Sequence, residues 1–437
     1  MKLKLGTTRR SMLLAGAGSV LAACGGAQEA GVSLKVNQPT TVAYLLNGNN
    51  TGTVTDITKK LYETEFRAQN PNITIDFQGS GSSGAEHIVK ITALTAAGTQ
   101  PDAFYLSNSG DMPALATKSV VRAVDDLIRA DGRFKKDDWF EVHLGAWQYQ
   151  KKQMGLPWQG GPLAFYYNKE LLGEAGVAAP SEATWTFDAW RDAGNKLRRV
   201  MTVTDTPKWA TDVGGQWLHW VYAFGGDVLD KDNKKCILDA KEALAGLQLM
   251  ADFIHRDQIA LKPQDFGGKT HAQLFMEKRL AMIVMNRQNA SAQGFIQPWV
   301  AITQLPKGPA GRFSQGNIDG FSMGSQTKSP AAAWEAMKFR TGDPLRRELL
   351  KSGNGGIPAL KTTANSQEYL NDKLPVEWNK MFTSTMSVVK LAPPIPEWSD
   401  VTAAAGQSID QIKKGEVSPQ TAMKDLAPRI NALLTTK

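Results

Sequence analysis

Cysteine is nearly absent from this chain, which has only Cys24 and Cys236 among its 437 residues. If Cys24 is modified, as argued below, no intramolecular disulfide can form and the fold must rely on packing. Cys236 is then predicted to be a small buried side chain. Histidine is also sparse, and the five histidines form no H-x-x-x-H pair and meet no cysteine cluster. The sequence therefore predicts neither a metal site nor a cofactor.

Long hydrophobic runs are missing as well, apart from the segment Met12–Ala23 near the N-terminus. This segment is too short to span a bilayer as a stable helix. No acidic residue occurs before Glu29, and the segment follows four basic residues, Lys2, Lys4, Arg9 and Arg10. This order is typical of an export signal, assigned here to residues 1–23. Arg9-Arg10 with the following Ser11 resembles a twin-arginine signal, whereas an ordinary export signal is the alternative.

The sequence Leu21-Ala22-Ala23-Cys24 resembles a bacterial lipobox, in which the thiol of the cysteine is acylated. The alternative is a plain cleaved signal with an incidental cysteine. Residues 24–40 are rich in Gly, Ala, Gln and Ser and are interpreted as a flexible tether of roughly 20 Å. We therefore expect an exported protein that is lipid-anchored on the outer face of the cytoplasmic membrane, on the periplasmic side in a Gram-negative cell.

Charge of one sign is not in large excess. The full chain has a formal net charge of +8, and the predicted signal holds four of its basic residues and no acid. The exported part is thus near +4. Because no Lys/Arg tract or aromatic–basic stripe occurs, nucleic acid is not an expected partner.

About 400 residues remain, enough for two domains with their own cores. The first part alternates between strand and helix patterns. The expected strands are 42–46, 73–77 and 103–106, and the expected helices are 56–69 and 85–97. This alternation predicts an α/β fold with a mostly parallel sheet covered by helices. Further helices are expected at 186–199, 239–254, 270–278, 331–340 and 407–434, and a strand at 281–285.

Residues 155–172, GLPWQGGPLAFYYNKELL, are predicted to carry the chain from one domain to the next. Leu163–Tyr167 is an apolar run typical of a buried strand. Gly and Pro crowd residues 155–162, where we expect the backbone to bend rather than pair. Trp158 and Gln159 lie at this bend, where their side chains can face a cleft.

GLPW with FYYNKELL, NPNITIDFQ, and QPDAFYLSNSGDMPALATKSVVRAVDDLI together resemble the family 1 extracellular solute-binding proteins of ABC importers, the maltose-binding-protein type. The resemblance implies a two-lobed type II periplasmic-binding-protein fold whose hinge closes on a ligand. It implies an N-terminal lobe of residues 41–154 and 303–356 and a C-terminal lobe of residues 155–302 and 357–437. It also implies a carbohydrate ligand, ABC permease subunits as partners, a monomer, and no enzymatic activity.

Three enzyme-like motifs argue for other classes. GSGSSG at 79–84 has dinucleotide-fingerprint spacing, but Asp102 precedes its strand instead of ending it. GFSMG at 320–324 matches a nucleophile elbow, yet no histidine follows Ser322. Gly268-Lys269-Thr270 lacks the earlier glycine of a P-loop because Pro263 stands there. An exported glycosidase stays open, since its paired carboxylates need not be close in sequence. Candidates for such a pair are Asp102, Asp111, Asp227, Asp319 and Glu397.

The expected ligand site combines aromatic planes for sugar rings with polar groups for hydroxyls. Trp158 and Trp398 are predicted to stack on the bound sugar. Arg287 departs from the family pattern and keeps an anionic ligand open, such as a uronate or a phosphodiester of glycerol. The full set of candidate binding residues is Asn47, Ser80, Ser82, Ser107, Asn108, Trp158, Gln159, Trp217, Trp220, Asp227, Asn286, Arg287, Asp319, Gly356 and Trp398.

Overall fold

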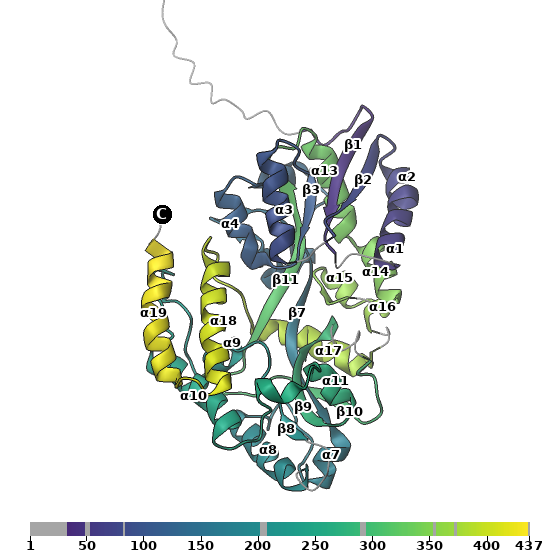
Figure 1. Cartoon of the computed structure of the whole chain (residues 1–437). Helices are drawn as coiled ribbons and strands as arrows, with labels where there is room; N and C mark the ends of the chain where they lie inside the picture. The colour runs from purple at the N-terminus through teal and green to yellow at the C-terminus, as the bar shows by residue number, and fades with distance from the viewer. Residues whose placement is uncertain are drawn as a thin grey trace, which may run out of the picture.

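The fold is built on one long mixed sheet that runs through both lobes (Figure 1). A computed structural model describes residues 33–48, 53–81, 84–201, 208–288, 294–352, 355–370 and 374–435. The export signal, Cys24 and Ser82 lie outside these ranges. The strands follow in the order β2 (Ile73–Gly79), β1 (Thr40–Leu46), β3 (Ala103–Leu106), β11 (Ser314–Gly324), β7 (Gly155–Asn168), β9 (Leu280–Asn286) and β8 (Trp209–Thr211).

The N-terminal lobe holds parallel strands at one edge of this sheet. β1 pairs in parallel with both β2 and β3, whereas β11 joins β3 in the antiparallel direction. The short strands are β4 (Val121–Arg122), β5 (Gln148–Tyr149), β6 (Lys152–Gln153) and β12 (Ile357–Pro358). The helices are α1 (Thr53–Leu61), α2 (Arg67–Gln69), α3 (Ala85–Ala96), α4 (Met112–Thr117), α5 (Asp125–Ala130), α6 (Glu141–Ala146), α13 (Pro330–Thr341), α14 (Asp343–Lys351), α15 (Lys361–Ala364) and α16 (Gln367–Leu370).

The C-terminal lobe surrounds the other end of the sheet, where β8 and β9 are parallel and β9 and β10 are antiparallel to β7. Its further strands are β10 (Val300–Thr303) and β13 (Val389–Lys390). Its helices are α7 (Lys169–Glu174), α8 (Phe187–Met201), α9 (Leu218–Ala223), α10 (Lys241–His255), α11 (His271–Met276), α17 (Val376–Thr385), α18 (Trp398–Lys414) and α19 (Pro419–Thr435).

The predicted α/β fold is confirmed, and most predicted elements agree with the structure to within a few residues. β3 coincides with its predicted range, and α8 begins after Thr186, whose hydroxyl accepts a hydrogen bond from the Ala189 N–H at 3.1 Å. Such a side-chain cap satisfies one of the amides that a helix start leaves unpaired. The helical prediction for residues 407–434 is wrong only at the break between two helices: Gly415, at φ +80°, ends α18, and α19 follows separately.

Residues 155–162 were expected to bend without pairing, and this prediction is also wrong. β7 is a continuous strand from Gly155 to Asn168. Its first half pairs with β11, from Ser322 opposite Gly155 to Gly316 opposite Pro162. Its second half pairs with β9 and β10 in the C-terminal lobe. The two long strands therefore join the lobes as a hydrogen-bonded ribbon, as Figure 1 shows at its centre.

The return of the chain to the C-terminal lobe comes later than residue 357. β12 pairs with Gln159 and Gly160 of β7. Farther on, α16 is tied to α14 by an ion pair between Glu368 and Arg347 at 3.0 Å. Residues 357–370 thus pack on the N-terminal lobe. Beyond the ribbon, the start of α18 also touches that lobe, because the Ser399 hydroxyl donates to Asp111 at 2.7 Å.

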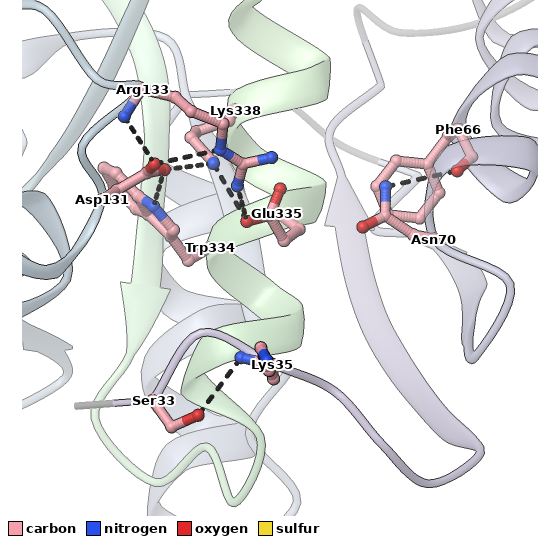
Figure 2. Close-up of polar contacts among 9 residues, drawn as sticks. All are labelled: Ser33, Lys35, Phe66, Asn70, Asp131, Arg133, Trp334, Glu335 and Lys338. Carbon is pink, nitrogen blue, oxygen red and sulfur yellow. Dashed lines mark hydrogen bonds and ion pairs between the residues drawn. The ribbon is translucent and has the colours of Figure 1, made fainter.

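A buried carboxylate holds the end of the N-terminal lobe together (Figure 2). Asp131 accepts hydrogen bonds from the indole N–H of Trp334 at 3.0 Å, from Arg133 at 3.1 Å and from Lys338. Its side chain is 2% exposed. Burial alone would raise the pKa of Asp131, but the bonds from Lys338 and Trp334 outweigh it and hold the pKa well below its usual range.

Asp131→Asn is expected to lower the free energy of unfolding by about 3 kcal/mol at pH 7, because it leaves buried donors without their charged acceptor. A carboxyl with a depressed pKa adds stability above about pH 4 and loses it as the pH falls. The loss should therefore shrink at pH 3. Urea unfolding at both pH values measures it.

Asp126→Asn is the matched control. Asp126 pairs with Arg122 one turn away, and the side chains are 30% and 27% exposed. Asp126→Asn should lower the free energy of unfolding by less than about 1 kcal/mol. Equal effects of the two substitutions would contradict the buried role of Asp131.

Candidate ligand-binding site

The two lobes meet at a polar hollow beside the ribbon. This inner hollow has a volume of about 170 Å³. Residues of both lobes and of the ribbon line it: Val54, Tyr105, Ser107, Trp158, Gln159, Gln288, Asp319, Arg346, Leu349 and Gly355. A middle hollow of about 100 Å³ adjoins it and is lined by Ser107, Gln159, Gly160, Gly161, Gln216, Asn286, Gln288, Asn317, Asp319 and Gly356. The four residues common to both hollows show that they form one cleft.

Asp319 of β11 is the polar centre of this cleft. One carboxylate oxygen, Oδ2, accepts hydrogen bonds from the Tyr105 hydroxyl and from Nε2 of Gln159, both at 2.8 Å. The Gly356 N–H in turn donates to Oε1 of Gln159 at 2.9 Å. The Gln159 amide is thus fixed in one orientation. This chain of bonds ties β3, β7, β11 and the segment before β12 around the same point.

The pKa of Asp319 is raised to about 6, mainly because protein surrounds the carboxyl on every side except the cleft. The hydrogen bonds from Gln159 and Tyr105 and the nearby charge of Arg346 oppose this rise. Asp319 is therefore mostly ionised at neutral pH.

Arg346 of α14 brings the opposite charge to the inner hollow. Its Nη2 donates to the Gly356 carbonyl oxygen at 2.8 Å. Burial, together with the neighbouring Arg287 and Arg340, lowers its pKa to about 9, so it still carries a proton at pH 7. A Cβ on Gly355, at φ +137°, would lie 2.3 Å from Nη2, so this position requires glycine.

Trp158 forms the wall of the inner hollow and is only 6% exposed. The guanidinium carbons of Arg340 and Arg346 lie 4.2 and 5.0 Å from its ring centroid. The Tyr105 ring meets it edge to face at 5.9 Å. Cation–π and aromatic contacts of this kind fix the indole rigidly. It therefore meets the hollow with a small part of its surface rather than with a fully open ring face.

Six of the predicted site residues are brought together here. They are Ser107, Trp158, Gln159, Asn286, Asp319 and Gly356, all of which line one or both hollows. Ser80 follows β2 and Asn47 follows β1, but neither residue lines the inner or the middle hollow. Asn47 is 2% exposed. The Asn108 side chain accepts from the Gly110 N–H at 2.9 Å and so caps the short helix Ser109–Asp111.

The other predicted residues are used in packing or ion pairing. Trp220 lies inside α9, and Trp398 begins α18. Both belong with Trp217 to the core of the C-terminal lobe. Asp227 forms an ion pair with Lys390 at 2.6 Å. None of these four residues lines the inner or middle hollow.

Arg287 is fully buried behind the cleft. Its Nε donates to Asn379 at 2.9 Å, another nitrogen donates to the Gly355 carbonyl oxygen, and its guanidinium lies 4.6 Å from the Tyr369 ring centroid. Through these contacts, Arg287 holds Gly355 and α17 in place. The cationic side chain that reaches the hollow is instead Arg346, which the sequence reasoning missed.

Several further residues of the cleft were not predicted from the sequence. Tyr105, Gln216, Gln288, Asn317, Arg346 and Leu349 line the cleft but were not predicted to do so. One signal for Arg346 was available, because it lies on the helix face that also carries the buried Leu345, Leu349 and Leu350. A charged residue on an apolar helix face needs a specific partner.

Two residues considered with the enzyme-like motifs have structural contacts. Ser322 of the elbow-like motif is fully buried and donates to the Met154 carbonyl oxygen at 2.9 Å. Asp102 accepts from the Ala43 N–H at 2.9 Å, which fixes the start of β3 against β1. Within the described ranges, no group of three or more His, Cys, Asp or Glu side chains could hold a metal ion. None of the described helices is long and apolar enough to span a membrane.

A cleft lined by polar groups between two lobes that share a strand ribbon defines a two-lobed ligand-binding protein. Residues 51–344 match the family model described as bacterial extracellular solute-binding protein. The chain belongs to this family.

Curated relatives and solved structures agree with this assignment. A binding protein of Brucella abortus is 24% identical over 384 residues, covering 84% of this chain and 88% of that protein. The arabinooligosaccharide-binding protein of Halalkalibacterium halodurans is 28% identical over 237 residues, covering 54% and 45%. An ABC substrate-binding protein of Listeria monocytogenes, solved with cycloalternan, has a TM-score of 0.78 at 21% identity and covers 92% of this chain and 100% of that chain. The sugar-binding protein MalE of Xanthomonas citri has a TM-score of 0.78 at 18% identity, covering 90% and 97%.

Asp319→Asn is expected to stabilise the protein by about 1–2 kcal/mol at pH 8. The amide keeps an oxygen for Tyr105 and Gln159 but removes a poorly solvated charge. A carboxyl with a raised pKa favours folding below its unfolded value, and this contribution is lost as the pH rises to about 6. The difference between variant and parent should thus grow from pH 4 to pH 6 and then level off. Urea unfolding across this range tests it, and a variant less stable than the parent at pH 8 would refute it.

Proposed function

We propose that this protein is the extracytoplasmic substrate-binding component of an ABC importer, and that it captures a carbohydrate between its lobes and delivers it to the membrane permease. The observation that carries the proposal is the charge-balanced polar cleft. Asp319 and Arg346 face the same inner hollow and offset each other. Such a hollow favours a neutral ligand rich in hydroxyl groups, because an anion would meet Asp319 and a cation would meet Arg346.

The sugar-binding relatives support the same ligand class. The names of the similar proteins include an arabinooligosaccharide-binding protein and a receptor solved with cycloalternan. The amides of Gln159, Gln288 and Asn286 can bind hydroxyls as donors and as acceptors. Trp158 supplies apolar surface at the wall. Ligand would close the lobes only through contacts that improve in the closed form.

The screen for this function is a thermal-shift assay of the full chain. Its arms are monosaccharides, arabino-oligosaccharides, malto-oligosaccharides, uronates and phosphodiesters of glycerol. Stabilisation by neutral sugars supports the proposal, whereas stabilisation by the uronates or phosphodiesters alone refutes it. The protein is proposed to bind its ligand without catalysing a reaction, so a stabilising sugar should be recovered intact. Product formation would assign an exported hydrolase instead.

Trp158→Phe should weaken binding of the stabilising sugar about tenfold, since the smaller ring loses contact area at the wall but still packs under Arg340. Trp209→Phe is the control, because Trp209 of β8 is also partly covered by an arginine but lines neither hollow. Its affinity should stay within twofold of the parent. Calorimetry measures both, and parental affinity in Trp158→Phe would exclude the indole from the site.

We further propose that Cys24 is acylated and holds the protein, as a monomer, on the outer face of the cytoplasmic membrane. The lipobox sequence supports this anchor. One acyl chain binds reversibly, so stable attachment requires several. Cys24→Ala should move the protein from the membrane fraction to the soluble fraction, as fractionation and immunoblotting would detect. A variant that stays with the membrane would show that the anchor lies elsewhere.

A further inference from the structure

The cleft does not end at the middle hollow but continues over the C-terminal lobe. An outer hollow of about 190 Å³ shares Gln216 and Asn286 with the middle hollow. An end hollow of about 220 Å³ shares Asp212, Gly215 and His271 with the outer one. Four hollows therefore lie in a row, from the inner hollow at the ribbon to the end hollow beside α18.

The end hollow contains a cluster of charged and aromatic side chains from three elements. Asp212 follows β8, His271 begins α11, and Lys413 lies near the end of α18. Asp410 and Phe266 also line this hollow, and the Phe266 ring lies 4.3 Å from the His271 ring. The cluster is separate from the Asp319–Arg346 pair and has no part in the inner hollow.

Hydrogen bonds hold this cluster in one geometry. Asp212 Oδ1 accepts from the Gly214 N–H at 2.7 Å, and its Oδ2 contacts His271 Nδ1. Lys413 Nζ donates to the Gly214 carbonyl oxygen at 3.0 Å. The turn at residue 214 thus positions both the carboxylate and the ammonium group. The Asp212 side chain is 4% exposed, and the His271 side chain is 33% exposed.

These contacts determine what the cluster offers a ligand. An ionised Asp212 can only accept, so a neutral His271 beside it would carry its proton on Nδ1 and present Nε2 as an acceptor. Lys413 has three ammonium hydrogens and uses one for the Gly214 carbonyl. An acceptor and a donor therefore face the same hollow. Adjacent hydroxyls on a sugar ring match this pair, because one can donate to His271 while the other accepts from Lys413.

The apolar lining suits a sugar ring as well. Phe266, Leu163 and Val284 line the end and outer hollows and can contact its C–H groups. Each of the four hollows, at 100–220 Å³, is smaller than the 300–1,000 Å³ that is typical of a small-molecule site. A ligand that fills the row must therefore be longer than one ring.

We propose that the end hollow is a distal subsite for the terminal unit of a neutral oligosaccharide, held through adjacent hydroxyls by His271 and Lys413. This inference rests on the proposed function and makes the ligand an oligosaccharide rather than a monosaccharide. A terminal uronate fits less well, because its carboxylate presents only acceptors to His271 Nε2 and to the carboxylates of Asp212 and Asp410.

The test measures affinity as a function of ligand length by calorimetry on the full chain at pH 7.5. The probes are arabinose and maltose series from monosaccharide to pentasaccharide, with the longest members also oxidised to a terminal carboxylate. In the parent, affinity should rise with length in the series that binds. His271→Ala and Lys413→Met should each weaken the longest neutral member about tenfold and leave the shortest binding member unchanged.

Lys414→Met is the matched control, since Lys414 is exposed on the same helix and lines none of the four hollows. It should bind every probe as the parent does. Equal loss at all lengths in the His271 and Lys413 variants, no loss in either, or preference for the oxidised member would each overturn the subsite. If sugars bind with no dependence on length, the subsite fails and the proposed function stands. If no sugar of any length binds, the proposed function itself fails.

Discussion

The pairing of β7 with β11 is the constraint on which the rest of the molecule depends. Because both strands continue from one lobe into the other, the lobes are joined by backbone hydrogen bonds rather than by free linkers. The ladder is interrupted where the lobes meet. Pro162 has no N–H to donate, and the Leu163 N–H donates to the Ser314 hydroxyl at 2.7 Å instead of to a carbonyl. Few backbone ladder bonds would break on bending at this point, so the sheet allows the lobes to move relative to each other here.

The same ribbon positions the chemistry of the cleft. Gln159 and Asp319 face each other from β7 and β11, and their hydrogen bond at 2.8 Å crosses the ribbon beside a register shift between Asp319 and Gly320. Such an irregularity redirects side chains at the place where it occurs. The strands that join the lobes thus also supply polar groups of the cleft.

Buried arginines surround this site and pack against aromatic rings. Arg340 and Arg346 lie against the Trp158 ring, while Arg287 lies over Tyr369 and donates to Asn379. Aromatic faces and carbonyl oxygens are thus partners of these guanidinium groups. Trp158 consequently has two roles, as a packing surface for two guanidinium groups and as the wall of the inner hollow. The sequence alone shows only that Trp158 lies in a segment rich in Gly and Pro.

The sequence alone determined the class of fold and much of the element order. Local pattern carries that information, as in β3, which is a continuous apolar run, and in α10, where buried apolar side chains recur every three or four residues. It also pointed to Trp158, Gln159, Ser107 and Asp319 as cleft residues, although only Ser107 follows a strand and the other three lie within β7 and β11.

Only the tertiary structure decided which polar and aromatic residues face that cleft. Trp398 and Arg287 seemed suited to a ligand by residue type, yet one is in a core and the other supports the backbone at Gly355. Arg346 and His271 reach the hollows from α14 and α11, elements whose own sequences give no sign of which lobe surface they meet. A residue's chemistry is local, whereas its solvent exposure depends on segments hundreds of residues away, and no pattern along the chain encodes that distance.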